Sequence, residues 1–103
     1  MAYTLILSTC PTRDSAEKIA TLLVEGRLAA CVQRLPIEST YLWQGKVVHG
    51  AEVALLIKSK AEHFDEVAAT IREHHDYELP EIISLPITAG LPGYLQWIND
   101  CTT

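Results

Sequence analysis

Histidines and cysteines are the side chains of this sequence best suited to chemistry with metal ions. His74 and His75 are adjacent, whereas the three cysteines, Cys10, Cys31 and Cys101, stand far apart. Imidazole suits Cu(II) and Zn(II) and a thiolate favours Cu(I), so a mixed site would suit copper. Adjacent side chains diverge by about 100° on a helix and roughly 180° on a strand, so this pair needs irregular chain, a third ligand or a second subunit to chelate one ion. The alternative for the pair is a helix-end role near the C-terminal dipole.

A second polar group would suit a small ligand. Glu78 and Glu81 flank Pro80, and Lys58 ends a neighbouring predicted strand. These three charges are expected to meet in a cleft between subunits, either as a structural ion pair or as a ligand-binding site. No glycine-rich loop of the kind that cradles phosphates accompanies them, so the sequence does not predict a nucleotide site.

Length and composition limit the classes of function. The chain has 103 residues, of which 49% are hydrophobic and 20% charged, and these values predict one domain spanning residues 1–103. Its 13 acidic residues outnumber 8 lysines and arginines, for a net charge of −5. Binding to nucleic acid needs a clustered basic face that neutralises phosphates, and the sequence has no such run, so no nucleic-acid partner is expected.

Neither a membrane partner nor a secretory signal is expected. The longest apolar runs, Leu28 to Val32 and Val53 to Ile57, are far shorter than the ~20 residues that span a bilayer. The first residues lack the basic start and the apolar length of a signal peptide. An odd number of cysteines with no close pair is typical of a reducing compartment. We therefore expect a cytoplasmic protein.

Hydrophobic periodicity and turn residues divide the chain into six main elements and a short terminal helix. Strands are expected at Tyr3 to Cys10, Ala29 to Trp43, Lys46 to Ser59 and Glu81 to Thr88, and helices from Asp14 to Gly26, from Lys60 to His74 and around Tyr94 to Ile98. Capping boxes are expected at Asp14 with Glu17 and at Ser59 with Glu62, and a kink or bulge at Pro36. The order β-α-β-β-α-β predicts an α+β fold, the ferredoxin-like split sandwich with a long hairpin between its second and third strands.

Two features of the predicted hairpin exceed what a monomer satisfies. Fifteen extended residues reach ~50 Å, whereas a domain of this size has a radius of gyration of ~13 Å, so the hairpin must extend beyond the body. In addition, Val53 to Ile57 is apolar on both faces, and the two main helices cover only one. A homo-oligomer would solve both problems. Its expected interface residues lie near the hairpin tip: Tyr41, Trp43, Val47 and Val48.

Catalytic arrangements are not evident in the sequence. It contains no nucleophile elbow and no zincin helix. Arg13 near the start of the first predicted helix invites comparison with acylphosphatases of this fold, but Thr9 to Thr12 replaces their glycine-rich loop. Fold analogy alone does not justify an activity, so the chain is predicted not to be an enzyme.

Several strings nevertheless resemble one family. They are RLAACV at residues 27–32, YLWQGK at 41–46, YELPEI at 77–82, the dipeptide PI at 86–87 and YLQW at 94–97. In one register along nearly the whole chain, they resemble the CutA divalent-cation tolerance proteins. The resemblance implies a ferredoxin-like subunit in a tight homotrimer and, for bacterial members, a link to copper tolerance. For some members it implies a signalling role similar to that of PII proteins.

The resemblance also implies a ligand set. In bacterial relatives for which copper binding is proposed, the ligands are a cysteine in the first strand and two adjacent histidines, which match His74 and His75. Ser8 occupies the position of that cysteine, and Cys10, two residues on, points to the same strand face about 6.6 Å away. The predicted ligands of copper or another divalent cation are therefore His74, His75 and Cys10. The alternative function is a PII-like regulatory scaffold that binds an effector near Lys58, Glu78 and Glu81.

Overall fold

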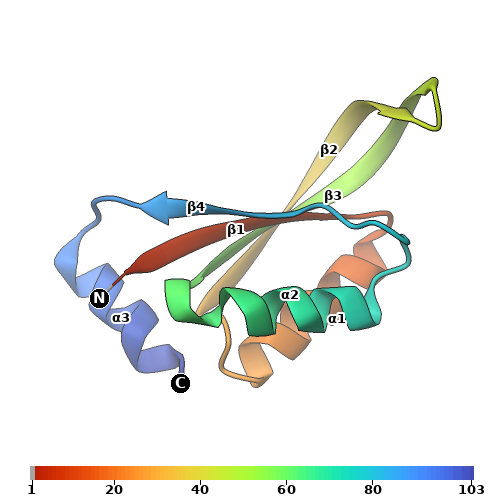
Figure 1. Ribbon diagram of the computed structural model, residues 1–103. Helices are drawn as coiled ribbons and strands as arrows, with labels where there is room; N and C mark the ends of the chain where they lie inside the picture. Colours follow the sequence, from red (N-terminus) through yellow and green to blue (C-terminus); the bar gives the residue numbers. More distant parts are fainter. Residues whose placement is uncertain (1) are drawn as a thin grey trace.

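A computed structural model describes residues 2–103 and contains strands, helices and one short 3₁₀ helix in alternation (Figure 1). Their order along the chain is β1 Tyr3–Cys10, α1 Arg13–Glu25, β2 Cys31–Trp43, β3 Lys46–Lys60, η1 Ala61–His63, α2 Phe64–His74, β4 Ile82–Ile87 and α3 Pro92–Cys101. No helix in this part of the chain is both long and apolar enough to cross a membrane.

The four strands form one antiparallel sheet in the order β2-β3-β1-β4. Helices α1 and α2 lie together on one face of this sheet, and α3 lies at the end near the N-terminus (Figure 1). This is the arrangement expected for a β-α-β-β-α-β chain, because each helical crossover skips one strand: β3 lies between β1 and β2, and β1 lies between β3 and β4. The predicted α+β ferredoxin-like fold is confirmed.

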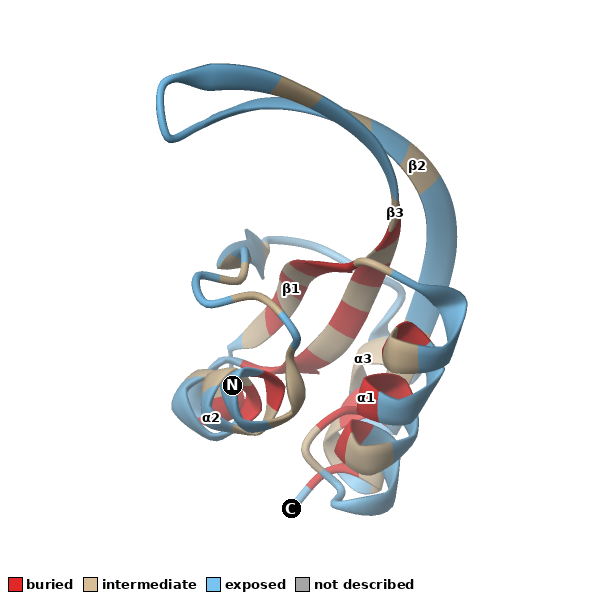
Figure 2. Ribbon diagram, turned by 90° about the vertical axis from the view of Figure 1, so that its right-hand side faces the viewer, coloured by how far each residue is buried: buried red, intermediate tan, exposed pale blue. Residues whose placement is uncertain are grey.

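The core lies between the sheet and its two helices. Alternate residues of β1 and β3, among them Ile6, Leu55 and Ile57, are fully buried against Leu23 of α1 and Ile71 of α2. Each buried aliphatic side chain contributes about 1.5–3 kcal/mol relative to exposure in water. In Figure 2 most of the buried residues accordingly lie in β1 and β3 and in the helices packed against them.

The opposite face of the sheet is apolar and open. Pairing places Leu5 beside Lys58 and Leu85, and Leu7 beside Leu56 and Ile83, all on the face away from α1 and α2. Ile83 and Leu85 are among the exposed large hydrophobic residues. We call this surface, formed by Leu5, Leu7, Leu56, Ile83 and Leu85, the open face. It is the uncovered second face that the apolar run in β3 predicts.

The far half of the β2–β3 hairpin extends beyond the sheet as a curved ribbon (Figures 1 and 2). We call this segment, residues 37–52, the arm. Its two strands pair with each other from Ile37 opposite Glu52 to Trp43 opposite Lys46, and none of these residues pairs with β1. The arm accounts for the elongated shape of the molecule, 44 × 25 × 22 Å. The register runs through Pro36 without a shift, so the predicted bulge is wrong; the hairpin bends smoothly instead.

Both predicted capping boxes are also wrong. Thr12, one residue before α1, accepts from the backbone N–H of Ser15, whose hydroxyl completes the box, so the helix begins before Asp14. The hydroxyl of Ser59 is used elsewhere, as a donor to the carbonyl of Leu28. The second helix therefore begins with the 3₁₀ turn of η1, which has no side-chain cap.

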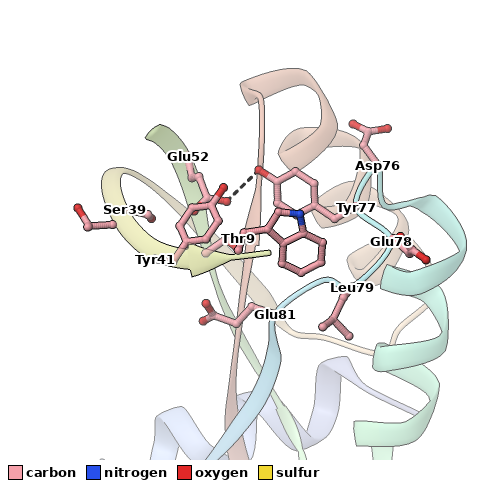
Figure 3. Close-up of a pocket in the computed structure, with 11 residues that line it drawn as sticks. Thr9, Ser39, Tyr41, Glu52, Asp76, Tyr77, Glu78, Leu79 and Glu81 are labelled. Atoms are coloured by element: carbon pink, nitrogen blue, oxygen red, sulfur yellow. Dashed lines mark hydrogen bonds between the residues drawn. The ribbon is translucent and has the colours of Figure 1, made fainter. Parts of the chain in front are cut away.

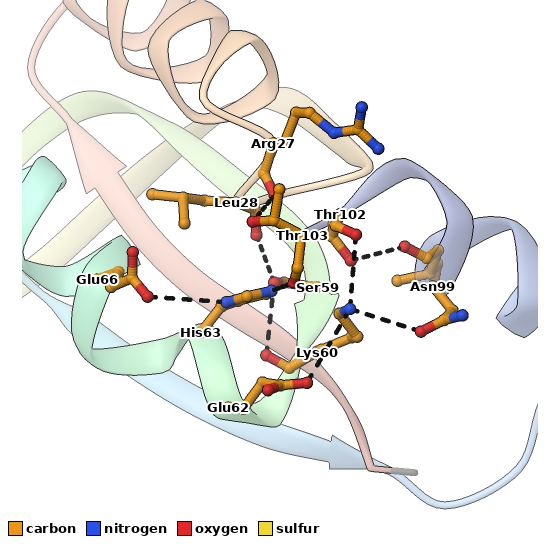
Figure 4. Close-up of polar contacts among 11 residues, drawn as sticks. Arg27, Leu28, Ser59, Lys60, Glu62, His63, Glu66, Asn99, Thr102 and Thr103 are labelled. Atoms are coloured by element: carbon orange, nitrogen blue, oxygen red, sulfur yellow. Dashed lines mark hydrogen bonds and ion pairs between the residues drawn. The ribbon is translucent and has the colours of Figure 1, made fainter.

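Polar contacts fix the C-terminal segment to the body (Figure 4). The Nζ of Lys60, which is buried, donates to the carbonyl of Thr102 and to Oδ1 of Asn99, each at 3.5 Å. His63 contacts the carbonyl of Thr103 through Nε2 and is buried in η1. His63 thus helps to hold the C-terminal segment against the body.

The arm depends on a tight turn whose two central residues, Gln44 and Gly45, have φ of 51° and 78°. Such a turn matches the twist of a hairpin but favours glycine, because a Cβ strains this conformation by about 1–2 kcal/mol. We predict that Gly45→Ala speeds amide hydrogen exchange at the arm tip by about fivefold. Gly50→Ala is the matched control, because Gly50 also has open space around its Cβ position but no positive φ. Equal effects of the two substitutions would contradict the prediction.

Candidate functional site

A cavity of about 670 Å³ lies between the arm, the end of β1 and the segment 76–81 that leads into β4 (Figure 3). The arm contributes one face, because Tyr41 and Trp43 of β2 share a side of the hairpin with Glu52 of β3. This size lies within the usual range of small-molecule sites. The lining residues are Thr9, Ser39, Thr40, Tyr41, Trp43, Glu52, Asp76, Tyr77, Glu78, Leu79 and Glu81.

A hydrogen bond from Tyr77 to Glu52 joins the two walls of the cavity. The Tyr77 hydroxyl donates to Oε2 of Glu52 at 3.0 Å (Figure 3). Burial, followed by the hydrogen bond and the charge of Glu52, raises the pKa of Tyr77 from 10.0 to about 12. The phenol therefore keeps its proton at neutral pH and remains a donor that links the arm to the 76–81 segment.

His75 holds Tyr77 in place through both ring nitrogens. Nε2 lies 2.6 Å from the carbonyl of Thr9, and Nδ1 accepts from the backbone N–H of Tyr77 at 3.0 Å. Because a carbonyl only accepts, Nε2 carries the proton and the ring is the neutral tautomer in this arrangement. The two rings also contact each other, with centroids 4.9 Å apart. His75 therefore ties the cavity wall to β1.

His74 is placed differently from its neighbour. It is the last residue of α2, and its Nδ1 lies 3.0 Å from the carbonyl of Thr70, one turn earlier, to which it donates. His75 follows in an extended conformation, with φ −92° and ψ 143°. The helix ends between the two residues, so their rings serve separate partners. Within residues 2–103, no hydrogen bond uses Nε2 of His74.

Cys10 lies at the end of β1 and is fully buried against the helices. Burial raises the pKa of its thiol from 9.0 to about 11; a hydrogen bond with Ser15 lowers it, and the charges of Asp76 and Glu52 raise it. The thiol is therefore neutral at physiological pH, whereas a metal ligand is the thiolate. Ser8 is buried on the same strand face, and its hydroxyl has no hydrogen-bond partner among residues 2–103.

The three predicted ligands do not form a metal site within one copy of the chain as described. No group of three or more histidine, cysteine, aspartate and glutamate side chains among residues 2–103 is arranged to hold a metal ion. Both ring nitrogens of His75 are hydrogen-bonded, and the thiol of Cys10 is buried and neutral. Among the three predicted ligands, this leaves Nε2 of His74 as the atom available to bind a metal ion. The assignment of His74, His75 and Cys10 to a metal therefore stays a prediction.

The predicted polar cluster is divided in the structure. Glu78 and Glu81 line the cavity, whereas Lys58 donates to the Tyr94 hydroxyl at 3.2 Å and lies 5.3 Å from the centre of that ring. Lys58 is six residues from Glu52 along β3, or about 20 Å at ~3.3 Å per residue. Among the described residues, Lys58 pairs with neither glutamate, so only the two carboxylates belong to this candidate site.

The predicted interface residues lie on both sides of the arm. Tyr41, Trp43 and Val48 are on the side that faces the cavity, and Val47 is on the other side with Leu42. Val47 and Leu42 are 66% and 70% exposed, more than either aromatic residue. No contact between copies is described, so the interface role stays a prediction.

Glu52, Tyr77 and Asp76 are cavity residues that the sequence analysis did not select. Strand register offers a signal for Glu52: with Gln44 and Gly45 as the turn, the alternation of the hairpin places it on the same side as Tyr41 and Trp43. Tyr77 and Asp76 offer no such signal, because their placement depends on how His75 anchors an irregular segment to β1.

Comparison with known proteins gives a family match over almost the whole chain. Residues 4–101 match the model of the family described as CutA1 divalent ion tolerance protein. The chain is similar to the divalent-cation tolerance protein CutA of Archaeoglobus fulgidus, with 39% identity over 98 residues that cover 95% of this chain and 96% of the relative. The family is named for tolerance of ions and not for a catalytic reaction.

Two further comparisons show the range of the similarity. The chain is 40% identical over 95 residues to the chloroplastic protein CutA of Arabidopsis thaliana; the match covers 91% of this chain but only 52% of that protein. The crystal structure of CutA from Xylella fastidiosa superposes with a TM-score of 0.95 at 47% identity, covering 98% of each chain. These comparisons support the fold over its full length.

The hydrogen bonds of His75 predict a structural role for it. We expect His75→Ala to lower the free energy of unfolding by about 1–3 kcal/mol, because it leaves the Thr9 carbonyl and the Tyr77 N–H without their partner. His74→Ala is the matched control and should cost less, since His74 is half-buried like His75 but makes one hydrogen bond instead of two. Denaturant unfolding measures both, and a larger loss for His74→Ala would contradict this assignment.

Proposed function

The chain belongs to the CutA1 divalent ion tolerance protein family, and from this we propose that it acts as a homotrimer that binds copper or a similar divalent ion. The observation that most strongly supports the proposal is the family match over residues 4–101, together with a surface suited to self-association. The trimer and the metal are two separate parts of the proposal, and each rests on its own residues.

Support for the trimer comes from the open face and the arm. A monomer would expose an apolar patch of a kind that monomers rarely expose to water. This patch consists of Leu5, Leu7, Leu56, Ile83 and Leu85. Packing the open faces of several copies together would remove the patch, and hairpins that embrace neighbouring copies would also shield the edge strands β2 and β4. The exposed side chains of the arm, including Val47 and Leu42, would then contact a neighbouring copy.

Metal binding would use His74 rather than the histidine pair. Its Nε2 is the imidazole nitrogen left available, and imidazole suits copper and zinc. The described part of one copy does not supply a full ligand set, so a second subunit or water would complete the coordination. We assign to the ion no chemistry beyond binding, in keeping with a proposed tolerance factor that is not an enzyme. The three free cysteines are consistent with the cytoplasm as the proposed location.

The cavity beneath the arm supports a second candidate function, a regulatory scaffold of the PII type. Such a protein would bind a small effector near a movable arm and pass the change to a partner. Glu78 and Glu81, two of the predicted effector residues, do line this cavity. Metal affinity would then be incidental.

The oligomer proposal predicts that one charge on the open face dissociates the trimer. We expect Leu85→Asp to shift the sedimentation coefficient from that of a trimer toward a monomer at micromolar concentration, because three buried carboxylates would face an apolar interface. Val24→Asp is the matched control: Val24 lies on α1 and is 43% exposed, against 42% for Leu85. A wild-type protein that sediments as a monomer would refute the proposal.

The metal proposal predicts that Cu(II) affinity depends on His74. We expect His74→Ala to weaken binding at least tenfold in a calorimetric titration. His49→Ala should leave binding unchanged, because His49 lies on the exposed arm beside Thr40. Unchanged affinity in His74→Ala would end its assignment as a ligand.

A further inference from the structure

We propose that the cavity beneath the arm binds an aliphatic polyamine, a flexible chain with two or more ammonium groups separated by methylenes. This inference rests on the second candidate function and names the chemical class of its effector. It depends on three properties of the cavity: its aromatic walls, the positions of its carboxylates and the hydrogen bonds that fix its shape.

Three aromatic side chains form the centre of the site. Tyr41, Trp43 and Tyr77 all line the cavity, together with Leu79. Aromatic faces attract ammonium groups within about 6 Å of the ring centre and also pack against methylenes. The cavity therefore suits a ligand that is cationic and partly apolar, whereas a strongly hydrated ion would gain nothing from these rings.

Four acidic residues line the cavity, and two of them have carboxylates beside the aromatic side chains. Glu52 and Glu81 lie on the side of Tyr41, whereas the carboxylates of Asp76 and Glu78, on the 76–81 segment, point away from the rings (Figure 3). Among the described residues that line the cavity, none is a basic lysine, arginine or histidine. The whole chain has a net charge of −5. The site therefore attracts cations.

The separation of the carboxylates favours several spaced charges over one compact charge. A divalent metal ion needs oxygen atoms that converge within about 2–2.6 Å of one point. Here Glu52 comes from the arm and Glu81 from the end of the 76–81 segment, so the two carboxylates beside the rings belong to different elements. A polyamine places ammonium groups at intervals along a chain, so it reaches both Glu52 and Glu81 while its methylenes contact the aromatic centre.

The walls are fixed before any ligand binds. Tyr77 donates to Glu52 at 3.0 Å, which orients one carboxylate and leaves its other oxygen, Oε1, for a ligand. His75 fixes the backbone of Tyr77 to β1. A site whose groups are already ordered loses less entropy on binding, which raises affinity for a given set of contacts.

The proposed trimer is compatible with this site. Tyr41 and Trp43 line the cavity, yet these two side chains remain 42% and 44% exposed. A neighbouring copy would therefore contact the exposed parts of the two side chains. The competing outcome is that the neighbour fills the cavity itself, in which case no small cation binds. The experiment below separates these outcomes.

The test is calorimetric titration of the full chain with spermidine at about 0.15 M salt, where surface charges are screened beyond about 8 Å. We expect saturable binding of one spermidine per chain, weakened at least fivefold in Glu52→Gln and in Glu81→Gln. Glu38→Gln is the matched control, because it removes the same charge from the opposite side of the arm and should stay within twofold of wild type. Trp43→Leu, checked for an unchanged sedimentation coefficient, tests the aromatic contribution and should also weaken binding.

Two results would overturn the inference. One is the absence of saturable binding at millimolar spermidine, the result expected if a neighbouring copy fills the cavity. The other is an equal loss in Glu38→Gln and Glu52→Gln, which would reveal attraction to overall charge only. Sedimentation and Cu(II) titration of the same samples keep the proposals separate, because a trimer that binds copper but not spermidine contradicts this inference alone.

Discussion

One constraint underlies the whole structure: the sheet has two apolar faces, but the chain contains only enough helix to cover one. Helices α1 and α2 bury Ile6, Leu55 and Ile57, whereas Leu5, Leu7 and Leu56 alternate with them and point to the other side. The hydrophobic effect makes that uncovered face costly in water. The proposed trimer follows from this imbalance, and the long arm provides each copy with a second region of contact.

The segment after α2 connects this architecture to the candidate site. The helix ends at His74, and His75 turns away in an extended conformation to bind β1 and Tyr77. Tyr77 in turn binds Glu52 on the arm. A short chain of hydrogen bonds therefore links the sheet, the 76–81 segment and the arm. Movement of the arm would consequently shift the cavity wall and the end of α2.

Sequence patterns predicted most of the fold because the relevant signals are local. The bounds of β1, the turn at Gln44 and Gly45 and the end of α2 at His74 follow from periodicity and turn residues. The caps were predicted wrongly, because Thr12 and Asp14 are both good N-caps and only the path of the chain decides between them. The site was harder to predict. Whether His75 binds a metal or a carbonyl depends on Thr9, which lies 66 residues away in the sequence. No local sequence pattern predicts a contact over that separation.

The most direct test of the account asks which surface of one copy contacts another. In a sample mixed from isotope-labelled and unlabelled chains, isotope-filtered nuclear Overhauser spectra detect only contacts between copies. The account predicts cross-copy signals from the methyl groups of Leu5, Leu7 and Leu56 on the open face. Their absence, with these methyl groups exposed to solvent or with signals only from the outer surfaces of α1 and α2, would contradict it.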